Sequence, residues 1–465
     1  MKKNVNKFIE TERLDPAKID LKNRKTRFIE IYQPFSQEQL AEQSERCLDC
    51  GNPYCQWKCP VHNYIPNWLK LANEGRIIEA VELSHMTNAF PEICGRVCPQ
   101  DRLCEGSCTL ENGFGAVTIG NIEKYITDKA FKLGWKPAYD KAIKSDKKVA
   151  IIGAGPAGLA CADRLLQSGI NVTIYDRQSH IGGLLTFGIP AFKLEKNILT
   201  HRYELLLEAG VTFHFNTEIG KDIQVEEIVN TYDAVFIATG TYQPLTEPAI
   251  SSYDGMHTEA LDYLEKVNQD VVNGNEIRLK KQIDGKKVVV LGGGDTTMDC
   301  IRTSIRLGAS QVIGVYRRDE KSMPGSKREF NNAREEGSEF IFNAQPIGLI
   351  IKNEKLHGIK FIKTQLITNA DSKTILEHIA GSEFELEADV VITAFGFKPE
   401  IMPWLKSCQV DTDNHGRVKV TPEQMQTNNP KVFAGGDIVR GASLVVNGIA
   451  DGIAAARGIK QFLLL

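Results

Sequence analysis

Eight of the eleven cysteines lie within the first 110 residues, in two groups of four. The first group occupies CLDCGNPYCQWKCP, residues 47–60, and the second occupies CGRVCPQDRLCEGSC, residues 94–108. The gaps are two, four and three residues in the first group, and three, five and three in the second. Thiols this dense in a long chain favour metal binding over disulfide bonds, because the cytosol, where we expect this chain, is reducing.

The spacing fits iron–sulfur clusters better than zinc. A structural zinc site commonly uses two C-x2-C pairs, and here only Cys47 and Cys50 form one. Proline follows Cys59 and Cys98, and in two-cluster ferredoxins the cysteine before proline ligates the other cluster. We therefore expect two [4Fe–4S] clusters with crossed ligands, and zinc or purely structural thiols are the alternatives. The ligands expected are Cys47, Cys50, Cys55 and Cys108 for one cluster, and Cys59, Cys98 and Cys104 for the other.

A complete G-x-G-x-x-G motif lies in KKVAIIGAGPAGLACADRLLQSGINVTIYD, residues 147–176. The pattern predicts a strand, a glycine turn, a helix and a second strand, which together form a dinucleotide-binding βαβ unit. Asp176 ends the second strand, where a carboxylate can accept hydrogen bonds from a ribose diol. The residues expected to bind this dinucleotide are Gly153, Gly155, Pro156, Ala157, Gly158, Asp176 and Arg177.

A second βαβ unit is predicted in KKVVVLGGGDTTMDCIRTSIRLGASQVIGVYRR, residues 286–318. Thr297 replaces the third glycine, so the helix is expected to pack slightly further from its strand. Arg317 and Arg318 replace the acidic residue, and arginine binds a 2′-phosphate where a carboxylate would repel it; two arginines that merely solvate a strand end are the alternative. The residues expected to bind NADPH are Gly292, Gly293, Gly294, Asp295, Thr296, Arg317 and Arg318.

The acidic residue in the first unit and the arginines in the second indicate FAD in the first and NADPH in the second. Hydride passes from nicotinamide C4 to flavin N5, a transfer that needs close stacking and no protein acid or base. We therefore expect no catalytic side chain.

The rest of the chain is organised around these units. A polar stretch, DKAIKSDKK at 140–148, predicts a linker, and strands followed by glycine are predicted at 234–240, 390–396 and 431–437. The net charge is −3, with 56 basic and 59 acidic residues well mixed, so no nucleic-acid or lipid surface is expected. The absence of a long apolar run and of an apolar core in MKKNVNKFIE predicts a cytoplasmic protein.

Over essentially its full length the chain resembles the small, FAD-containing β subunits of bacterial NADPH-dependent glutamate synthases. The resemblance is carried by CLDCGNPYCQWKCPVHNYIPNWLKLANEGR, EICGRVCPQDRLCEGSCTL, IGGLLTFGIPAFKLEK, VVVLGGGDTTMDC, YRRDEKSMPGSKRE and VFAGGDIVRGASLVV. The chain is also similar to the N-terminal part of dihydropyrimidine dehydrogenase and to the large subunit of bifurcating ferredoxin:NADP oxidoreductases.

The resemblance implies an α/β fold with a helical iron–sulfur domain followed by two Rossmann-like domains, arranged as in thioredoxin reductases. The implied boundaries are 1–145 for the domain with two [4Fe–4S] clusters, 146–247 and 390–465 for a discontinuous FAD domain, and 248–389 for the NADPH domain.

The resemblance also implies further site residues. One cluster in such relatives has a non-cysteine ligand, which matches Glu123 and leaves Cys94 as a spare thiol. The implied flavin contacts are Gly183, Leu184, Gly436, Asp437, Leu444 and Val445. The segment SLVVNGIAD departs from the family at Ser443, where aspartate is more usual.

The function implied is electron input to glutamate synthase. NADPH reduces FAD, and the clusters pass single electrons to an FMN-bearing large (α) subunit, where 2-oxoglutarate and ammonia from glutamine become glutamate. A free-standing NADPH:acceptor oxidoreductase, or a subunit of another complex, is the alternative within enzymes. A zinc-containing module that only senses NADPH is the alternative outside them.

Overall fold

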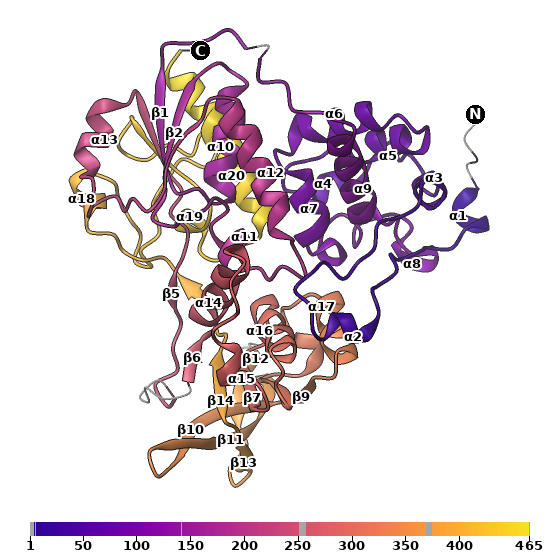
Figure 1. The fold of residues 1–465 in the computed structure, drawn as a ribbon, viewed down its shortest axis with the longest axis vertical. Coiled ribbons are helices and arrows are strands. Elements are labelled where there is room, and N and C mark those ends of the chain that lie inside the picture. The colour runs from indigo at the N-terminus through magenta and orange to yellow at the C-terminus, as the bar shows by residue number, and fades with distance from the viewer. Residues whose placement is uncertain (1–3, 5, 141, 251–256, 369–373, 465) are drawn as a thin grey trace.

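The computed structural model describes residues 4, 6–140, 142–250, 257–368 and 374–464, which form three parts (Figure 1). N-terminal helices lie beside a first α/β unit, and a second α/β unit carries a projecting group of antiparallel strands. The fold class expected from the sequence, α/β with a helical N-terminal domain, is confirmed. Within the described residues, no helix is both long enough and apolar enough to cross a bilayer.

Short helices joined by loops form the N-terminal part. They are α1 (Lys7–Glu10), α2 (Leu21–Arg24), α3 (Gln37–Glu45), α4 (Tyr54–Lys58), α5 (Ile65–Asn73), α6 (Ile77–Thr87), α7 (Pro91–Val97), the 3-10 turn η1 (Gln100–Arg102), α8 (Glu111–Phe114) and α9 (Ile119–Lys132). Trp68, Leu69 and Ile122 are buried in its core, and several of the cysteines pack against them. The apolar core therefore holds the irregular segments that carry the thiols.

The first α/β unit is a parallel sheet with the strand order β16-β4-β1-β2-β3. Its elements are β1 (Lys148–Ile152), α10 (Pro156–Leu166), β2 (Asn171–Tyr175), α11 (Leu184–Phe187), α12 (Lys196–Glu208), β3 (Thr212–His214), α13 (Val225–Thr231), β4 (Ala234–Ile237), α18 (Trp404–Ser407), β16 (Val432–Ala434), α19 (Asp437–Arg440) and α20 (Val445–Phe462). Of the linker predicted at 140–148, residue 141 lies outside the described residues, and residues 142–147 form no helix or strand.

The turn between β1 and α10 requires its glycines. Gly153 has φ +110°, and a Cβ on it would lie 2.3 Å from the carbonyl oxygen of Ala238. A Cβ on Gly158 would lie 2.0 Å from the carbonyl oxygen of Gly153. Any larger residue would push the helix from the strand, so both glycines are needed for the close approach.

The second α/β unit is a parallel sheet with the order β6-β14-β7-β8-β9. Its elements are β6 (His257–Glu259), α14 (Ala260–Val272), α15 (Lys280–Ile283), β7 (Lys287–Leu291), α16 (Asp295–Arg306), β8 (Gln311–Tyr316), the 3-10 turn η2 (Glu320–Ser322), α17 (Lys327–Glu335), β9 (Glu339–Phe342) and β14 (Val390–Thr393). The FAD domain was expected to resume at residue 390, but β14 pairs with β7 and therefore belongs to the second sheet. A strand that ends in glycine fits either sheet, and only its pairing shows to which sheet it belongs.

The chain crosses between the two α/β units twice, and the two crossing segments lie side by side. There β5 (Gln243–Pro244) pairs antiparallel with β15 (Phe397–Lys398). The second sheet also carries an antiparallel insertion between β9 and β14, visible at the bottom of Figure 1. Its strands are β10 (Ala344–Lys352), β11 (Lys355–Thr368), β12 (Thr374–His378) and β13 (Phe384–Glu387).

The helices α10 and α20 pack at a distance that only glycine permits. A Cβ on Gly452 of α20 would lie 2.1 Å from the carbonyl oxygen of Ala157 and 2.9 Å from the amide nitrogen of Cys161, and both are backbone atoms of α10. Since backbone atoms cannot rotate away, a larger residue must separate the two helices.

We predict that Gly452→Ala destabilises the first α/β unit by about 1–3 kcal/mol, the usual cost of overpacking a core. Because α10 begins at the glycine turn, bound flavin should also be released at a lower temperature. The temperature at which flavin fluorescence rises on heating measures both the unfolding of this unit and the release of its flavin. Gly348→Ala is the control, because a Cβ on Gly348 meets no atom within 4 Å; equal release temperatures in the two variants would refute the packing argument.

Candidate functional site

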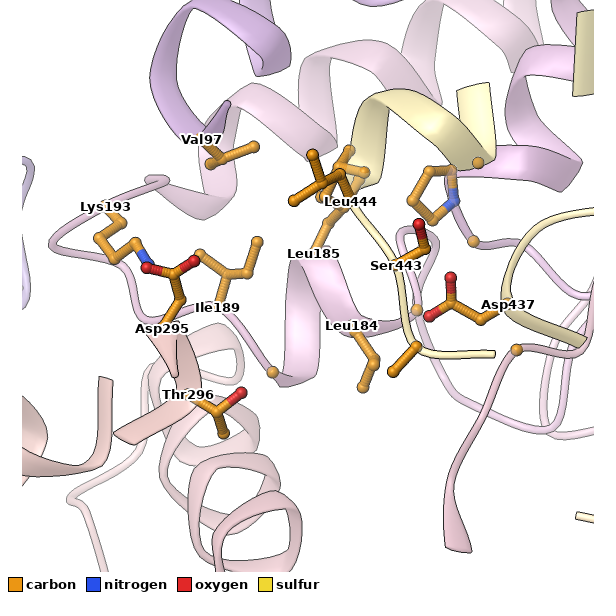
Figure 2. Close-up of a pocket in the computed structure, with 18 of the residues that line it drawn as sticks. Val97, Leu184, Leu185, Ile189, Lys193, Asp295, Thr296, Asp437, Ser443 and Leu444 are labelled. Carbon is orange, nitrogen blue, oxygen red and sulfur yellow. The ribbon is translucent and has the colours of Figure 1, made fainter. Parts of the chain in front are cut away.

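A cavity of about 710 Å³ lies where the three parts of the molecule meet (Figure 2). Figure 2 shows Lys193, Asp295 and Thr296 towards one end of the cavity and Asp437 and Ser443 towards the other. Most of the residues expected to bind FAD line this cavity: Gly153, Gly155, Pro156, Ala157, Asp176, Arg177, Gly183, Leu184, Gly436, Asp437, Leu444 and Val445. Gly155 leaves open space for a dinucleotide beside the backbone, because an added Cβ there would meet no atom within 4 Å.

Asp176 is held rigidly at the end of β2. Its Oδ2 accepts a hydrogen bond from the backbone N–H of Ala154 at 2.6 Å, and its Oδ1 accepts one from the N–H of Gln178 at 2.7 Å. Burial raises the pKa of the Asp176 carboxyl, while these two hydrogen bonds oppose the shift. Each oxygen keeps a lone pair, so the carboxylate can also accept from a ribose hydroxyl.

Asp437 lies across the cavity at the start of α19. It follows Gly436, whose φ of +76° suits glycine. Burial raises the pKa of Asp437 to about 7, and the hydroxyl of Thr241 donates to its Oδ2 at 3.4 Å. The buried Oγ1 of Thr239, which also lines the cavity, has no hydrogen-bond partner among the described residues. These polar atoms can form hydrogen bonds with the ribityl hydroxyl groups of a flavin nucleotide.

The N-terminal helices also border the cavity. Val97, Cys98 and Pro99, at the end of α7, belong to its lining, and Val97, Leu185 and Leu444 belong to or pack against the same apolar cluster (Figure 2). Cys98 is one of the expected cluster ligands. The structure therefore places a ligand candidate of one cluster at the wall of the expected flavin site.

Four of the thiols converge on one small cavity. Cys47, Cys50, Cys55 and Cys108 all line it, together with apolar side chains such as Leu69. Burial raises the pKa of the Cys55 thiol to about 12, and nearby Cys47 and Cys108 add to the shift. A bound metal group would offset this cost, because it stabilises thiolates. These four cysteines are the ligands that the sequence predicted for the first cluster.

The other thiols gather around Glu123. Burial raises the pKa of Glu123 to about 8. Burial is the main cause of the raised pKa values of the Cys59 and Cys104 thiols, and the nearby Glu123 carboxylate adds to the shift of these two thiols and of Cys98. The carboxylate is oriented by two buried amides, Asn63 Nδ2 and Asn88 Nδ2, each of which donates to Glu123 Oε1 at 3.3 Å.

Cys94 also reaches this second group. A hydrogen bond between Cys94 and Cys98 is the largest cause of the raised pKa of Cys98. The Cys94 thiol also donates to Asn88 Oδ1 at 3.7 Å. Both fourth-ligand candidates, Glu123 and Cys94, therefore lie beside the three thiols, and Asn88 touches both.

In the part of the chain that the structure describes, no three His, Cys, Asp or Glu side chains are close enough to hold one metal ion. The cysteines interpreted as core residues, Cys161, Cys300 and Cys408, are buried elsewhere.

The second glycine turn has only part of its expected residues in the cavity. Asp295 and Thr296 line it, whereas Gly292, Gly293 and Gly294 form the turn behind them. Arg317 and Arg318 follow β8 outside the cavity wall. Arg317 is exposed, and the buried Nε of Arg318 has no hydrogen-bond partner among the described residues. The Arg317 side chain is therefore open to an anion from solvent, whereas the Nε of Arg318 is enclosed by protein.

Several lining residues were not expected as site residues. One of them is Tyr242, whose ring centroid lies 4.4 Å from the guanidinium carbon of the expected residue Arg177. Ile189 and Lys193 lie in the segment IGGLLTFGIPAFKLEK, and Val97 precedes Cys98. Tyr242 follows a predicted strand-to-glycine ending, and this was the only sequence signal that could have identified it.

Two family models match the chain. Residues 24–135 match dihydropyrimidine dehydrogenase domain II, 4Fe-4S cluster, and residues 147–452 match pyridine nucleotide-disulphide oxidoreductase. Together they cover the helical part and both α/β units.

Curated relatives are similar over nearly the whole chain. The glutamate synthase [NADPH] small chain of Escherichia coli (strain K12) is 55% identical, and the match covers 100% of both chains. The putative oxidoreductase AegA of the same organism is 51% identical over 97% of this chain but only 69% of its own length.

Two solved structures share the fold of the α/β units. Mycobacterium tuberculosis FprA in complex with NADPH has a TM-score of 0.57 at 18% identity, covering 69% of this chain and 85% of that chain. The thioredoxin reductase of T. acidophilum has a TM-score of 0.51 at 21% identity, covering 69% and 100%. The expected thioredoxin-reductase-like arrangement is confirmed.

We predict that Cys108→Ser and Cys47→Ser abolish the same electron paramagnetic resonance signal, because both thiols line one cavity. Glu123→Ala should alter only the other signal, and Cys94→Ser should leave both. Iron content and spectra of the reduced variants measure this, with Cys408→Ser as a control in a distant buried thiol. A cluster lost in Cys94→Ser but kept in Glu123→Ala would reverse the choice of fourth ligand.

We predict that Arg317→Ala or Arg318→Ala raises the KM for NADPH roughly ten- to hundredfold, because a hydrogen bond to a charged group contributes about 1.5–3 kcal/mol. NADH kinetics, FAD content and iron content should not change. Steady-state kinetics with both coenzymes measure the effect, and Arg334→Ala on the exposed face of α17 is the control. Equal losses with NADPH and NADH would mean that the arginines only solvate the strand end.

Proposed function

Because the chain belongs to the family of glutamate synthase NADPH small chains, we propose that it is the electron-input subunit of a glutamate synthase. It is an NADPH-dependent oxidoreductase with a 4Fe-4S domain and an FAD- and NADPH-binding fold. One observation carries the proposal. A single cavity is lined by residues of both nucleotide units and by Cys98 of the cysteine-rich domain.

The described side chains bind and orient the two nucleotides. When bound, FAD accepts a hydride at N5 from nicotinamide C4, and the clusters carry electrons one at a time. The glycine turn at the start of α10 approaches the pyrophosphate, and the helix N-terminus offers it free N–H groups. Leu184, Leu185 and Ile189 form an apolar part of the cavity wall, which would exclude water from bound flavin and nicotinamide rings. No protein acid or base is needed.

The residue assignments are part of the proposal. FAD is assigned to Gly153, Gly155, Pro156, Ala157, Gly158, Asp176, Arg177, Gly183, Leu184, Gly436, Asp437, Leu444 and Val445. NADPH is assigned to Gly292, Gly293, Gly294, Asp295, Thr296, Arg317 and Arg318. Two [4Fe–4S] clusters are assigned to Cys47, Cys50, Cys55 and Cys108, and to Cys59, Cys98, Cys104 and Glu123.

The partner proposed is a large subunit that carries FMN. On that subunit the electrons would serve the conversion of 2-oxoglutarate and ammonia from glutamine into glutamate. The relatives are named small chains of glutamate synthase, and this name supports a large-subunit partner. We propose the cytoplasm as the compartment and no nucleic acid or membrane as partner.

A second candidate function is supported by one relative. AegA, a putative oxidoreductase, matches 97% of this chain within a longer protein. The same module can therefore occur outside a protein named glutamate synthase, as an NADPH:acceptor oxidoreductase that works alone or in another complex.

We predict that the anaerobically purified chain contains about eight iron atoms and one FAD per polypeptide, as two four-iron clusters require. NADPH oxidation that depends on glutamine and 2-oxoglutarate should appear only when a large chain is added. Iron and flavin analysis and a spectrophotometric assay with and without that chain test this. Zinc in place of iron would refute the clusters, and glutamine-independent turnover with another acceptor would favour the second candidate.

A further inference from the structure

The segment Pro190–Glu195 lies between the three parts of the molecule. It follows Gly188 and Ile189, which line the cavity, and it ends at the start of α12. Its side chains contact the second α/β unit and the N-terminal helices. This junction segment therefore joins the flavin wall to both neighbours.

Phe192 of the junction segment packs onto α16. Its side chain is 1% exposed, and its ring centroid lies 4.4 Å from the guanidinium carbon of Arg302 and 3.9 Å from that of Arg306. Both arginines are buried and form ion pairs with Glu336 at 2.9 and 2.7 Å. Phe192 thus contacts two arginine side chains of α16 that are themselves held by their ion pairs with Glu336.

Lys193 adds a directed contact to the same helix. Its Nζ lies 2.9 Å from Asp299 Oδ1, and the two side chains are only 12% and 7% exposed. Breaking a buried ion pair leaves two unpaired charges with little water to solvate them. The pair therefore opposes any movement of α16 away from the junction segment.

The helix α16 is the one that begins at the second glycine turn. Asp295 and Thr296, its first residues, line the cavity, and Asp299 lies one turn further along. The ion pair with Lys193 holds Asp299 in place, and it therefore also holds the first turn of α16, which is expected to approach NADPH. On its other side the junction segment is held by Glu195, whose Oε1 accepts a hydrogen bond from the backbone N–H of Glu30 at 3.0 Å.

We propose that Lys193 is a positioning residue for hydride transfer, acting through its ion pair with Asp299. The pair holds the start of α16 against the flavin wall, so that the nicotinamide and the flavin meet without reorientation of the two α/β units. This inference rests on the proposed transfer from NADPH to FAD.

The test uses the holoprotein and four variants: Lys193→Met, Lys193→Arg, Asp299→Asn, and the double variant Lys193→Met with Asp299→Asn. Anaerobic stopped-flow reduction of FAD by NADPH gives the limiting rate and the dissociation constant of NADPH separately. Lys193→Met and Asp299→Asn should each lower the limiting rate about ten- to hundredfold, since a displacement of about 1 Å has effects of this size. The dissociation constant should change by less than about threefold.

Coupling between the two residues distinguishes a pair from independent roles. If they act through one ion pair, the double variant is no slower than the slower single variant, and Lys193→Arg keeps most of the rate. Effects that multiply in the double variant overturn the proposal. So does a raised dissociation constant with an unchanged rate, because Lys193 would then bind the coenzyme itself.

Controls separate this inference from folding and from the proposed function. FAD and iron content should match the wild type in each variant, and Lys266→Met, which breaks the exposed pair with Asp262, should leave the rate unchanged. If Lys193→Met loses FAD, the comparison is made between Lys193→Arg and Asp299→Asn, and equal rates in these two overturn the proposal. Wild-type FAD that NADPH does not reduce would instead refute the proposed function.

Discussion

The shared core between the N-terminal helices and the first α/β unit is the constraint on which the rest of the structure depends. Phe90 and Ile93, near the start of α7, are buried in the same apolar cluster as α10 and α20. A buried ion pair crosses the same boundary, with Arg202 Nη2 2.7 Å from Glu92 Oε1. Since separating these surfaces would expose apolar area and leave charges unpaired, α7 is held in place. Cys98 follows α7 directly and therefore stays at the cavity wall.

The two α/β units are both parallel five-stranded sheets, and they differ in the charge of the residues that follow one strand. In the first, the strand after the helix ends at Asp176, whose carboxylate is held by backbone N–H groups. In the second, the equivalent strand ends at Arg317 and Arg318, and no acidic side chain among the described residues pairs with either. The proposed assignment of FAD to the first unit and NADPH to the second therefore rests on the sign of charge at this strand end.

Local patterns predicted the parts of the site that depend on backbone geometry. The glycine turns were recognisable because φ at Gly153 and the close approach at Gly158 exclude other residues. The grouping of Cys108 with Cys47 could be predicted because cluster ligands have characteristic spacing. The sheet to which β14 belongs could not be predicted, because strand pairing depends on residues that lie far apart in the sequence. Lys193 was missed for the same reason: its partner Asp299 lies on another domain.

The crossed order of the thiols constrains how the N-terminal part matures. Cys108 lines the same small cavity as Cys47, Cys50 and Cys55, so any metal group bound by all four closes a loop that contains α4, α5, α6 and α7. During synthesis the first three thiols emerge well before the fourth. A cluster with full ligation thus has to wait until the whole cysteine-rich segment has left the ribosome. Once in place, it would act as a cross-link that restricts the unfolded chain, as long-range loop closures do.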